Sequence, residues 1–329
     1  MPFIPLAPGD EDRHILFAPD ADENVRESLA YLLPLPALEL GIIVYTWVHA
    51  AGRDGRGRAG SMAVVYGPGV ESTVSEATDG VLVPDSLGFE DWRVGSITLE
   101  AATDMMTTQL RFAGQRIDLE YVFEGINPPF AFLRHPGGCP SWLADDRTEQ
   151  GGRVVGSLVL DGVRHDFDTF GHRDHSWGRR DWGGPTHWKW WNLMAPDVSI
   201  HLMELQYFGR TTLHGYVHRD GVTSLITGYD IDVEFDGQVM QTALTGSILD
   251  EDGRRTRIAT SHGADLHWPV SPFLSLHEAS MHAEIEGVPG AAYIEMAWPP
   301  AYLAHHSATP EADASELTVD REVELSGHS

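Results

Sequence analysis

An alternation of apolar and polar residues with a period of two is the feature that most restricts the fold of this chain. In residues 116–124 (RIDLEYVFE) the apolar side chains fall on one face and most of the acidic ones on the other, as in a half-buried β-strand. Asp-Gly pairs, which favour two-residue hairpin turns, occur at residues 161–162, 236–237 and 252–253. The pattern predicts an all-β protein, with a short helix only near residues 22–32.

The chain has 329 residues, enough for two domains of common size. Residues 127–152 are rich in proline and glycine and are expected to form a crossing segment or linker. This division predicts an N-terminal β domain at residues 1–150 and a C-terminal β domain at residues 151–329, which includes the segment 170–191 discussed below. Each domain has the length of one β-barrel or β-sandwich.

Charge and cysteine content exclude several classes of partner. The chain has 22 basic and 49 acidic residues, a net charge of −27, whereas nucleic acids and anionic membranes are bound by lysine and arginine. The N-terminus has no basic start, and the apolar stretch 31–48 is interrupted by proline and glutamate, so neither a signal peptide nor a membrane span is expected. One cysteine, Cys139, cannot form an intramolecular disulfide. We expect a cytoplasmic protein, and its oligomeric state is left open.

Residues 170–191 (FGHRDHSWGRRDWGGPTHWKWW) form an unusual cluster. Half of the ten tryptophans lie within fifteen residues here, beside several histidines, aspartates and basic side chains. Tryptophan supplies apolar walls, and buried Asp and His titrate closer to neutral pH, so the cluster fits a general acid/base site. Arginine stacked on indole and paired to carboxylate is also a common scaffold, which is the structural alternative.

The run G-H-R-D-H-S-W-G-R-R-D-W at residues 171–182 resembles the signature of the AttH-like and hydroxyneurosporene synthase (carotenoid hydratase) superfamily. The element D-H-x-W-G corresponds to Asp174, His175, Trp177 and Gly178, and the form D-H-S-W-G-x-R-D-W looks like a branch of that group without a settled activity. The hairpin G-x-L-x-L-D-G at residues 156–162 is similar too. The resemblance implies two lipocalin-like, calycin-type antiparallel β-barrels packed together, with a hydrophobic pocket and members that add water to an isoprenoid double bond.

These observations predict a cofactor-independent lyase or isomerase that uses acid/base catalysis on a hydrophobic, isoprenoid-like small molecule. The reaction would be a hydration, dehydration, double-bond isomerisation or cyclisation, without a cofactor or metal. Asp174 is expected to donate a proton to an alkene, His175 to orient Asp174 or a water molecule, and Arg173 to complete the catalytic set. The expected substrate-binding residues are Trp177, Trp182, Trp188, Trp190, His201 and Tyr121.

Two other classes of protein remain open. A lipocalin-like carrier would bind an apolar ligand without changing it, since barrels of this size hold one small ligand. A non-haem iron oxygenase would use His172-x-Asp174 as two ligands of a 2-His-1-carboxylate site. The third ligand would come from His201, His214, His267 or His277.

Overall fold

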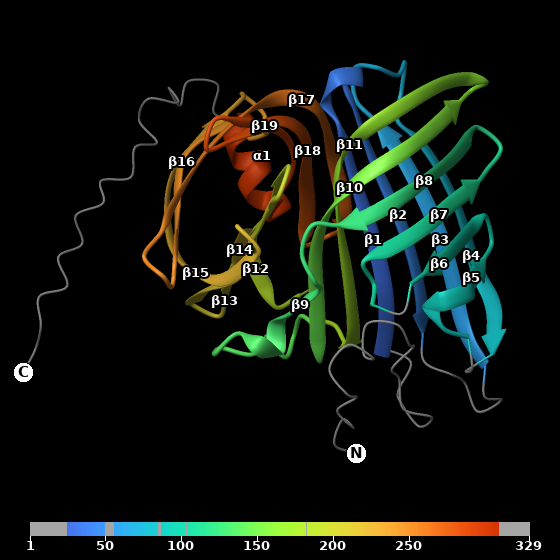
Figure 1. Cartoon of the computed structure of the whole chain (residues 1–329), viewed down its shortest axis with the longest axis horizontal. Coiled ribbons are helices and arrows are strands. Elements are labelled where there is room, and N and C mark those ends of the chain that lie inside the picture. Colours follow the sequence, from blue (N-terminus) through green and yellow to red (C-terminus); the bar gives the residue numbers. More distant parts are fainter. Residues whose placement is uncertain (1–24, 50–55, 85–86, 103, 182, 309–329) are drawn as a thin grey trace, which may run out of the picture.

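The computed structural model describes residues 25–49, 56–84, 87–102, 104–181 and 183–308. They form two antiparallel β-sheets that lie side by side, with very little helix (Figure 1). One sheet is a closed eight-stranded barrel, and the other has eleven strands and is nearly closed. The expected all-β fold of two packed barrels is confirmed.

The first sheet has the strand order β4-β3-β2-β1-β11-β10-β8-β7-β6-β5, and β9 pairs with β10. Its ends lie close to each other, and Ser61 Oγ on β3 donates to the carbonyl oxygen of Val94 on β5 at 2.9 Å. Two short 3₁₀ helices, η2 (Phe89–Asp91) and η3 (Phe132–Arg134), lie in its connections. Its strands are β1 (Val25–Leu35), β2 (Leu40–His49), β3 (Arg56–Tyr66), β4 (Val74–Pro84), β5 (Trp92–Val94), β6 (Ile97–Ala101), β7 (Thr107–Ala113), β8 (Ile117–Gly125), β9 (Phe130–Ala131), β10 (Asp146–Leu160) and β11 (Val163–Arg179).

The second sheet is a meander in which each strand pairs with the next and β12 pairs with β19 to close the barrel. A short 3₁₀ helix, η1 (Pro36–Leu38), joins β1 to β2, and the α-helix α1 (Pro300–Ala308) follows the barrel. No helix within the described residues is both long and apolar enough to cross a membrane. The barrel strands are β12 (Pro185–Ala195), β13 (Val198–Tyr207), β14 (Arg210–Arg219), β15 (Val222–Phe235), β16 (Gln241–Asp250), β17 (Arg255–Ser271), β18 (Leu274–Ile285) and β19 (Val288–Trp298).

The short helix expected near residues 22–32 is wrong for the part that the structure describes, because that part belongs to strand β1. From Glu27 onward every residue of β1 is buried. One face of β1 packs inside the first sheet and the other faces the closed barrel. A strand buried on both faces has a nearly continuous apolar run, so it lacks the alternation that identifies a half-buried strand.

The sheets divide the chain later than residue 150, the expected domain boundary. Residue 150 lies within β10, which pairs with β8 and β11, and the chain passes to the closed barrel between Arg179 and Pro185. The Asp-Gly turn at residues 161–162 joins β10 to β11 within the first sheet, as its two-residue geometry requires. The motif containing Asp174 is therefore a part of the first sheet and faces the barrel from outside.

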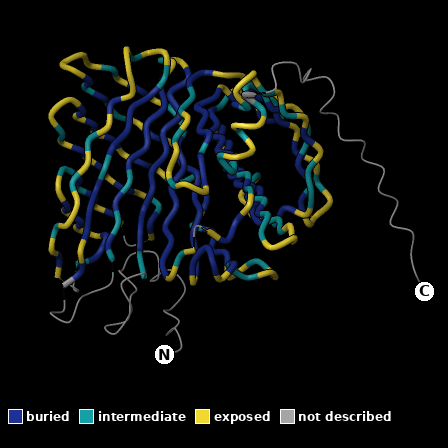
Figure 2. Tube along the Cα trace, turned by 180° about the vertical axis from the view of Figure 1, so that it is seen from behind, coloured by how far each residue is buried: buried dark blue, intermediate teal, exposed yellow. Residues whose placement is uncertain are grey.

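Each sheet encloses an apolar core, and a third apolar core lies between the sheets. Figure 2 shows the strands where the two sheets meet as continuously buried, while exposed residues are frequent in the outer loops. The third core includes Tyr66 of β3 together with Trp188 and Trp190 of β12. A hydrogen bond from the Leu35 backbone N–H to Ser280 Oγ, 3.1 Å long, also links the sheets. The two barrels therefore pack as one unit.

Candidate functional site

A pocket with a volume of about 550 Å³ lies between the two sheets, within the usual range for a small-molecule site. Its walls come from β1–β3, β10 and β11 of the first sheet and from β12, β13 and β17–β19 of the barrel. The charged residues that line it are Arg26, Arg147, Asp174, Arg180, Glu278 and Glu295. Its apolar lining includes Leu32, Ile43, Tyr45, Trp188, Trp190 and Met203.

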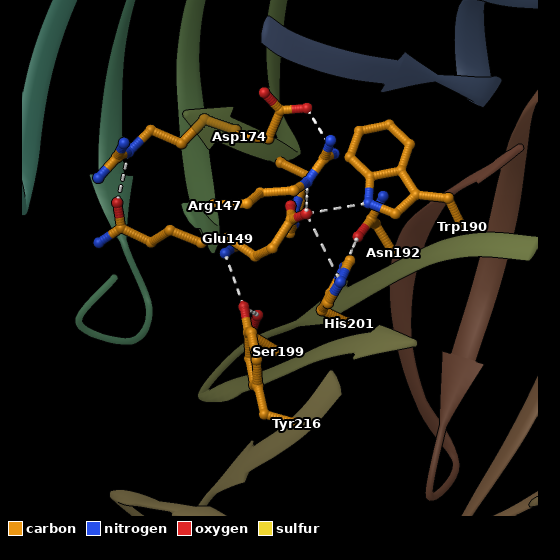
Figure 3. A network of polar contacts seen from close by, with 12 residues as sticks. Arg147, Glu149, Asp174, Trp190, Asn192, Ser199, His201 and Tyr216 are labelled. Carbon is orange, nitrogen blue, oxygen red and sulfur yellow. Dashed lines mark hydrogen bonds and ion pairs between the residues drawn. The ribbon is translucent and has the colours of Figure 1, made fainter. Parts of the chain in front are cut away.

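The side chain of Asp174 points toward this pocket because successive residues of β11 point to opposite faces of the strand. Asp174 pairs with Glu149 on β10, and the same face carries Arg147, whose Nη2 donates to Asp174 Oδ2 at 2.6 Å. The Arg147 guanidinium also lies 5.0 Å from the centre of the Trp190 ring (Figure 3). Burial raises the pKa of the Asp174 carboxyl, and the positive charge of Arg147 opposes that rise. Sequence reasoning identified Asp174 but missed Arg147, which lies outside the motif.

Behind Arg147 lies a buried set of three residues, Glu149, His172 and His201, which we call the Glu149 group. His172 Nε2 is 2.7 Å from Glu149 Oε2, and His201 Nε2 is 3.6 Å from Glu149 Oε1. Arg147 Nε and Trp190 Nε1 also donate to Glu149 Oε1. Burial alone would raise the pKa of Glu149, but Arg147, His201 and His172 together outweigh burial, and the pKa falls to about 2.

The Glu149 group has the composition of a 2-His-1-carboxylate metal site, with one donor atom from each residue within 4.8 Å of the others. Burial lowers the pKa of His201 to about 3, so its ring is neutral, as a metal ligand requires. The iron alternative paired His172 with Asp174. The structure instead places His172 beside Glu149, while Asp174 is bound by Arg147. If these residues hold a metal, the carboxylate comes from β10.

Three other residues of the motif, Arg173, His175 and Trp177, lie on the opposite face of β11, inside the first sheet. His175 Nε2 is 2.6 Å from Glu27 Oε1, and Arg173 Nε donates to Gln150 Oε1 at 2.6 Å. The Trp177 ring packs on His175 with a centroid distance of 4.8 Å. Consecutive residues of a strand point to opposite faces. The structure therefore separates His175 and Arg173 from Asp174 rather than gathering all three in the pocket.

The remaining predicted residues are divided between the pocket and its surroundings. Trp188 and Trp190 line the pocket, whereas Trp182 lies outside the described residues. His201 is fully buried in the Glu149 group, behind the pocket wall. Tyr121 belongs to the apolar core of the first sheet. It also borders a larger hollow of about 970 Å³ on the first sheet, which is lined by exposed charged side chains as well as by Tyr121 and Phe167.

Sequence reasoning also missed a pair of buried acidic residues, Glu278 and Glu295. They lie directly opposite each other on β18 and β19, and both line the pocket. Trp188 Nε1 donates to Glu295 Oε1 at 2.5 Å, whereas Glu278 Oε2 is buried and has no hydrogen-bond partner among the residues that the structure describes. Burial raises the pKa of Glu295 to about 7, and burial together with Glu295 raises that of Glu278 well above its ordinary value. Only the strand register brings the two together, and no local motif marks them.

Comparison with known proteins relates the chain to one family and one fold. The family model described as "Domain of unknown function (DUF7064)" matches residues 7–300. No curated protein sequence matches the chain.

Three solved structures resemble the fold, each at low sequence identity. An AttH-like protein (NE1406) from Nitrosomonas europaea has a TM-score of 0.58 at 13% identity, covering 89% of this chain and 98% of the other. Kievitone hydratase from Nectria haematococca has a TM-score of 0.52 at 11% identity, with coverages of 83% and 87%. CghA in complex with Sch210972 has a TM-score of 0.56 at 15% identity, with coverages of 84% and 88%. At these identities the likeness concerns the fold.

Proposed function

The chain belongs to the DUF7064 family, and on that premise we propose that it is an acid/base enzyme of the lyase or isomerase type, acting on an apolar small molecule. The observation that carries the proposal is the placement of buried carboxyl groups in an aromatic-walled pocket. The fold is shared with a protein named as a hydratase and with CghA, which supports the same reaction type. The motif resemblance at Asp174 supports it from the sequence.

The proton donor in this proposal is the Glu278–Glu295 pair. Two facing carboxyl groups in an apolar site cannot both ionise without strong repulsion, so the pair keeps a proton near neutral pH. Asp174 differs because Arg147 stabilises its charged form through a 2.6 Å contact. We therefore assign Asp174 the role of the base, which reverses the role expected from the sequence.

The reaction that these groups support begins with proton transfer from the pair to one carbon of an alkene. The π electrons of the double bond form the new C–H bond, and the neighbouring carbon becomes a cation. The π faces of Trp188 and Trp190 stabilise that cation. Asp174 then removes a proton, either from an adjacent carbon to give an isomer or from an added water molecule to give an alcohol. The reverse sequence is a dehydration, and none of these steps consumes an oxidant or reductant.

Deuterium incorporation tests this proposal before the natural substrate is known. The protein is incubated in D₂O with a panel of isoprenoid alkenes and alcohols, and products are analysed by mass spectrometry. We expect carbon-bound deuterium to accumulate with the wild-type protein and to be lost in Glu278→Gln, Glu295→Gln and Asp174→Asn. Glu284→Gln is the matched control, because Glu284 is an exposed residue of the same strand as Glu278.

A carrier function is the competing outcome of the same experiment. A carrier would bind panel members stoichiometrically, and their isotope content and structure would stay unchanged. Binding of an apolar ligand in the pocket without deuterium incorporation across the panel would therefore reject the enzyme and favour the carrier.

A further inference from the structure

The turn between β17 and β18 is exposed, apolar and free of charge. No aspartate, glutamate, lysine or arginine occurs between Asp265 and Glu278, in a chain in which 22% of the residues are charged. The exposed residues from 268 to 273 are Pro269, Val270, Pro272 and Phe273. Val270 is 42% exposed and Phe273 is 72% exposed. A group of exposed apolar side chains without charge is typical of a surface that binds an apolar partner.

Helix α1 begins beside this turn and also has no aspartate, glutamate, lysine or arginine. Trp298, the last residue of β19, lies opposite Ser275 of β18, and α1 begins two residues later. The Tyr302 ring of α1 stacks on Trp298 at a centroid distance of 5.2 Å, and Tyr302 is 39% exposed. Tryptophan and tyrosine are enriched at the boundary between lipid and water. We call residues 268–274 and helix α1 together the apolar end of the barrel.

The opposite end of the barrel is acidic. The strands of an antiparallel meander alternate in direction, so every second turn lies at the same end. Four turns lie opposite the apolar end, and each contains an acidic residue: Asp197, Asp220, Asp252 and Glu286. At the apolar end, the turn at residues 207–210 exposes Phe208, and the turn at residues 236–240 contains one acid, Asp236. The two ends of the barrel therefore differ in polarity.

The β17–β18 turn also forms part of the pocket wall. The residues of this turn that line the pocket are Trp268, Pro269, Val270, Ser271 and Leu274. Because Val270 both lines the pocket and is exposed to solvent, the turn lies at an opening of the pocket. An apolar molecule at the tip of the turn would reach the pocket without crossing bulk water.

We infer that the apolar end of the barrel docks on a lipid surface without net charge, and that the substrate passes from this surface over the β17–β18 turn into the pocket. Val270 and Phe273 insert at the boundary between head groups and acyl chains. The net charge of −27 disfavours an anionic surface, whereas a zwitterionic surface does not repel the protein. The inference rests on the proposed function only in taking the pocket as the destination, and it narrows the substrate class to molecules that reside in lipid.

Co-sedimentation with phosphatidylcholine vesicles tests the docking. The bound fraction of the protein is measured over a range of lipid concentrations, and we expect it to rise with lipid. Phe273→Asp should lower the partition coefficient about tenfold, because tenfold corresponds to about 1.4 kcal/mol, less than full burial of a phenylalanine contributes. Val270→Asp should lower the partition coefficient too. Val288→Asp is its matched control, because Val288 is 41% exposed and begins β19 at the acidic end.

The charge of the lipid gives a second test of docking. Replacing part of the phosphatidylcholine by phosphatidylserine should weaken binding, and added salt should restore it by screening the repulsion. Absence of binding to phosphatidylcholine vesicles, stronger binding to the anionic vesicles, or equal binding of Phe273→Asp and the wild type would overturn the inference. Self-association in lipid-free buffer that is lost in Phe273→Asp, without vesicle binding, would assign the surface to a second copy of the chain and would also overturn it.

Transfer of Nile red, a neutral apolar dye, from vesicles to the protein tests the passage into the pocket. We expect Phe273→Asp to slow the transfer severalfold and to keep the affinity for Nile red in lipid-free buffer, because Phe273 does not line the pocket. Loss of vesicle binding with Nile red affinity retained would overturn this inference and leave the proposed function standing. Vesicle binding without any Nile red uptake would overturn the passage step and the proposed pocket together.

Urea unfolding checks that the variants keep the fold. All three aspartate substitutions lie at exposed positions, so the unfolding midpoints should match that of the wild type.

Discussion

The Glu278–Glu295 pair makes a quantitative prediction about stability and pH. The carboxyl of Glu295 has a pKa of about 7 in the folded protein, against an ordinary value of 4.5. Between these values the folded state binds more protons than the unfolded state, so stability falls as the pH rises through this window. One pKa unit corresponds to about 1.4 kcal/mol, so the contribution of Glu295 decreases by about 2–3 kcal/mol between pH 5 and pH 8. Glu278, whose pKa is also raised, acts in the same direction.

The assay is denaturant unfolding followed by tryptophan fluorescence at pH 5, 6, 7 and 8. The wild-type protein is compared with the double variant Glu278→Gln/Glu295→Gln, because the difference between them cancels the other titrating groups. That correction matters since buried histidines such as His187 and His214, with pKa values lowered to about 4, change stability in the opposite sense over part of this range. We expect the wild type to lose at least about 2–3 kcal/mol relative to the double variant from pH 5 to pH 8, because Glu278 adds to the contribution of Glu295.

Glu284→Gln should follow the wild-type profile, since the side chain of Glu284 is exposed on the same strand. Parallel pH profiles for the wild type and the double variant would show that the pair does not hold an extra proton in the folded state. The assignment of the pair as proton donor would then fail.

Three further outcomes follow from individual contacts. Trp188→Phe removes the donor to Glu295, so its carboxyl pKa should rise further and the pH-dependent loss of stability should extend above pH 7, as the same unfolding assay measures. Gly67→Ala should destabilise the fold by about 1–3 kcal/mol in urea unfolding, because φ is +120° and the new Cβ would lie 2.4 Å from a backbone oxygen. When the chelator-treated protein is titrated with Zn²⁺, we expect no tightly bound equivalent, because Arg147 already neutralises the carboxylate of the Glu149 group. Binding of one equivalent of Zn²⁺ that is lost in Glu149→Gln would contradict this.

The sequence predicts the class of fold well because the signals are local. Alternation in residues 116–124 matches strand β8, and the turn at residues 161–162 joins β10 to β11. Strand β1 is the exception, because burial on both faces removes the period-two pattern that a prediction needs. The domain boundary depends on which strands pair, and the proline-rich segment gives no information about pairing.

The candidate site can be predicted only in part from the sequence, again because part of the information lies in strand pairing and burial. The motif identifies β11 as an unusual strand, and alternation separates Asp174 from His175, but both faces of this strand are buried. The sequence therefore does not indicate which face meets the pocket. Glu278 and Glu295 are seventeen positions apart and become neighbours only through the register of β18 and β19. Such pairs follow from strand pairing and leave no trace in local spacing.

The position of the pocket between the sheets has a consequence for how the protein folds. Its ionisable groups come from β1, β10 and β11 on one side and from β18 and β19 on the other, so neither half of the chain contains a complete binding site. Before the halves dock, Trp188 and Trp190 would be exposed to water, and their burial favours docking. Ligand affinity thus appears only at the last stage of assembly, and a bound ligand should stabilise the association of the two halves more than either half alone.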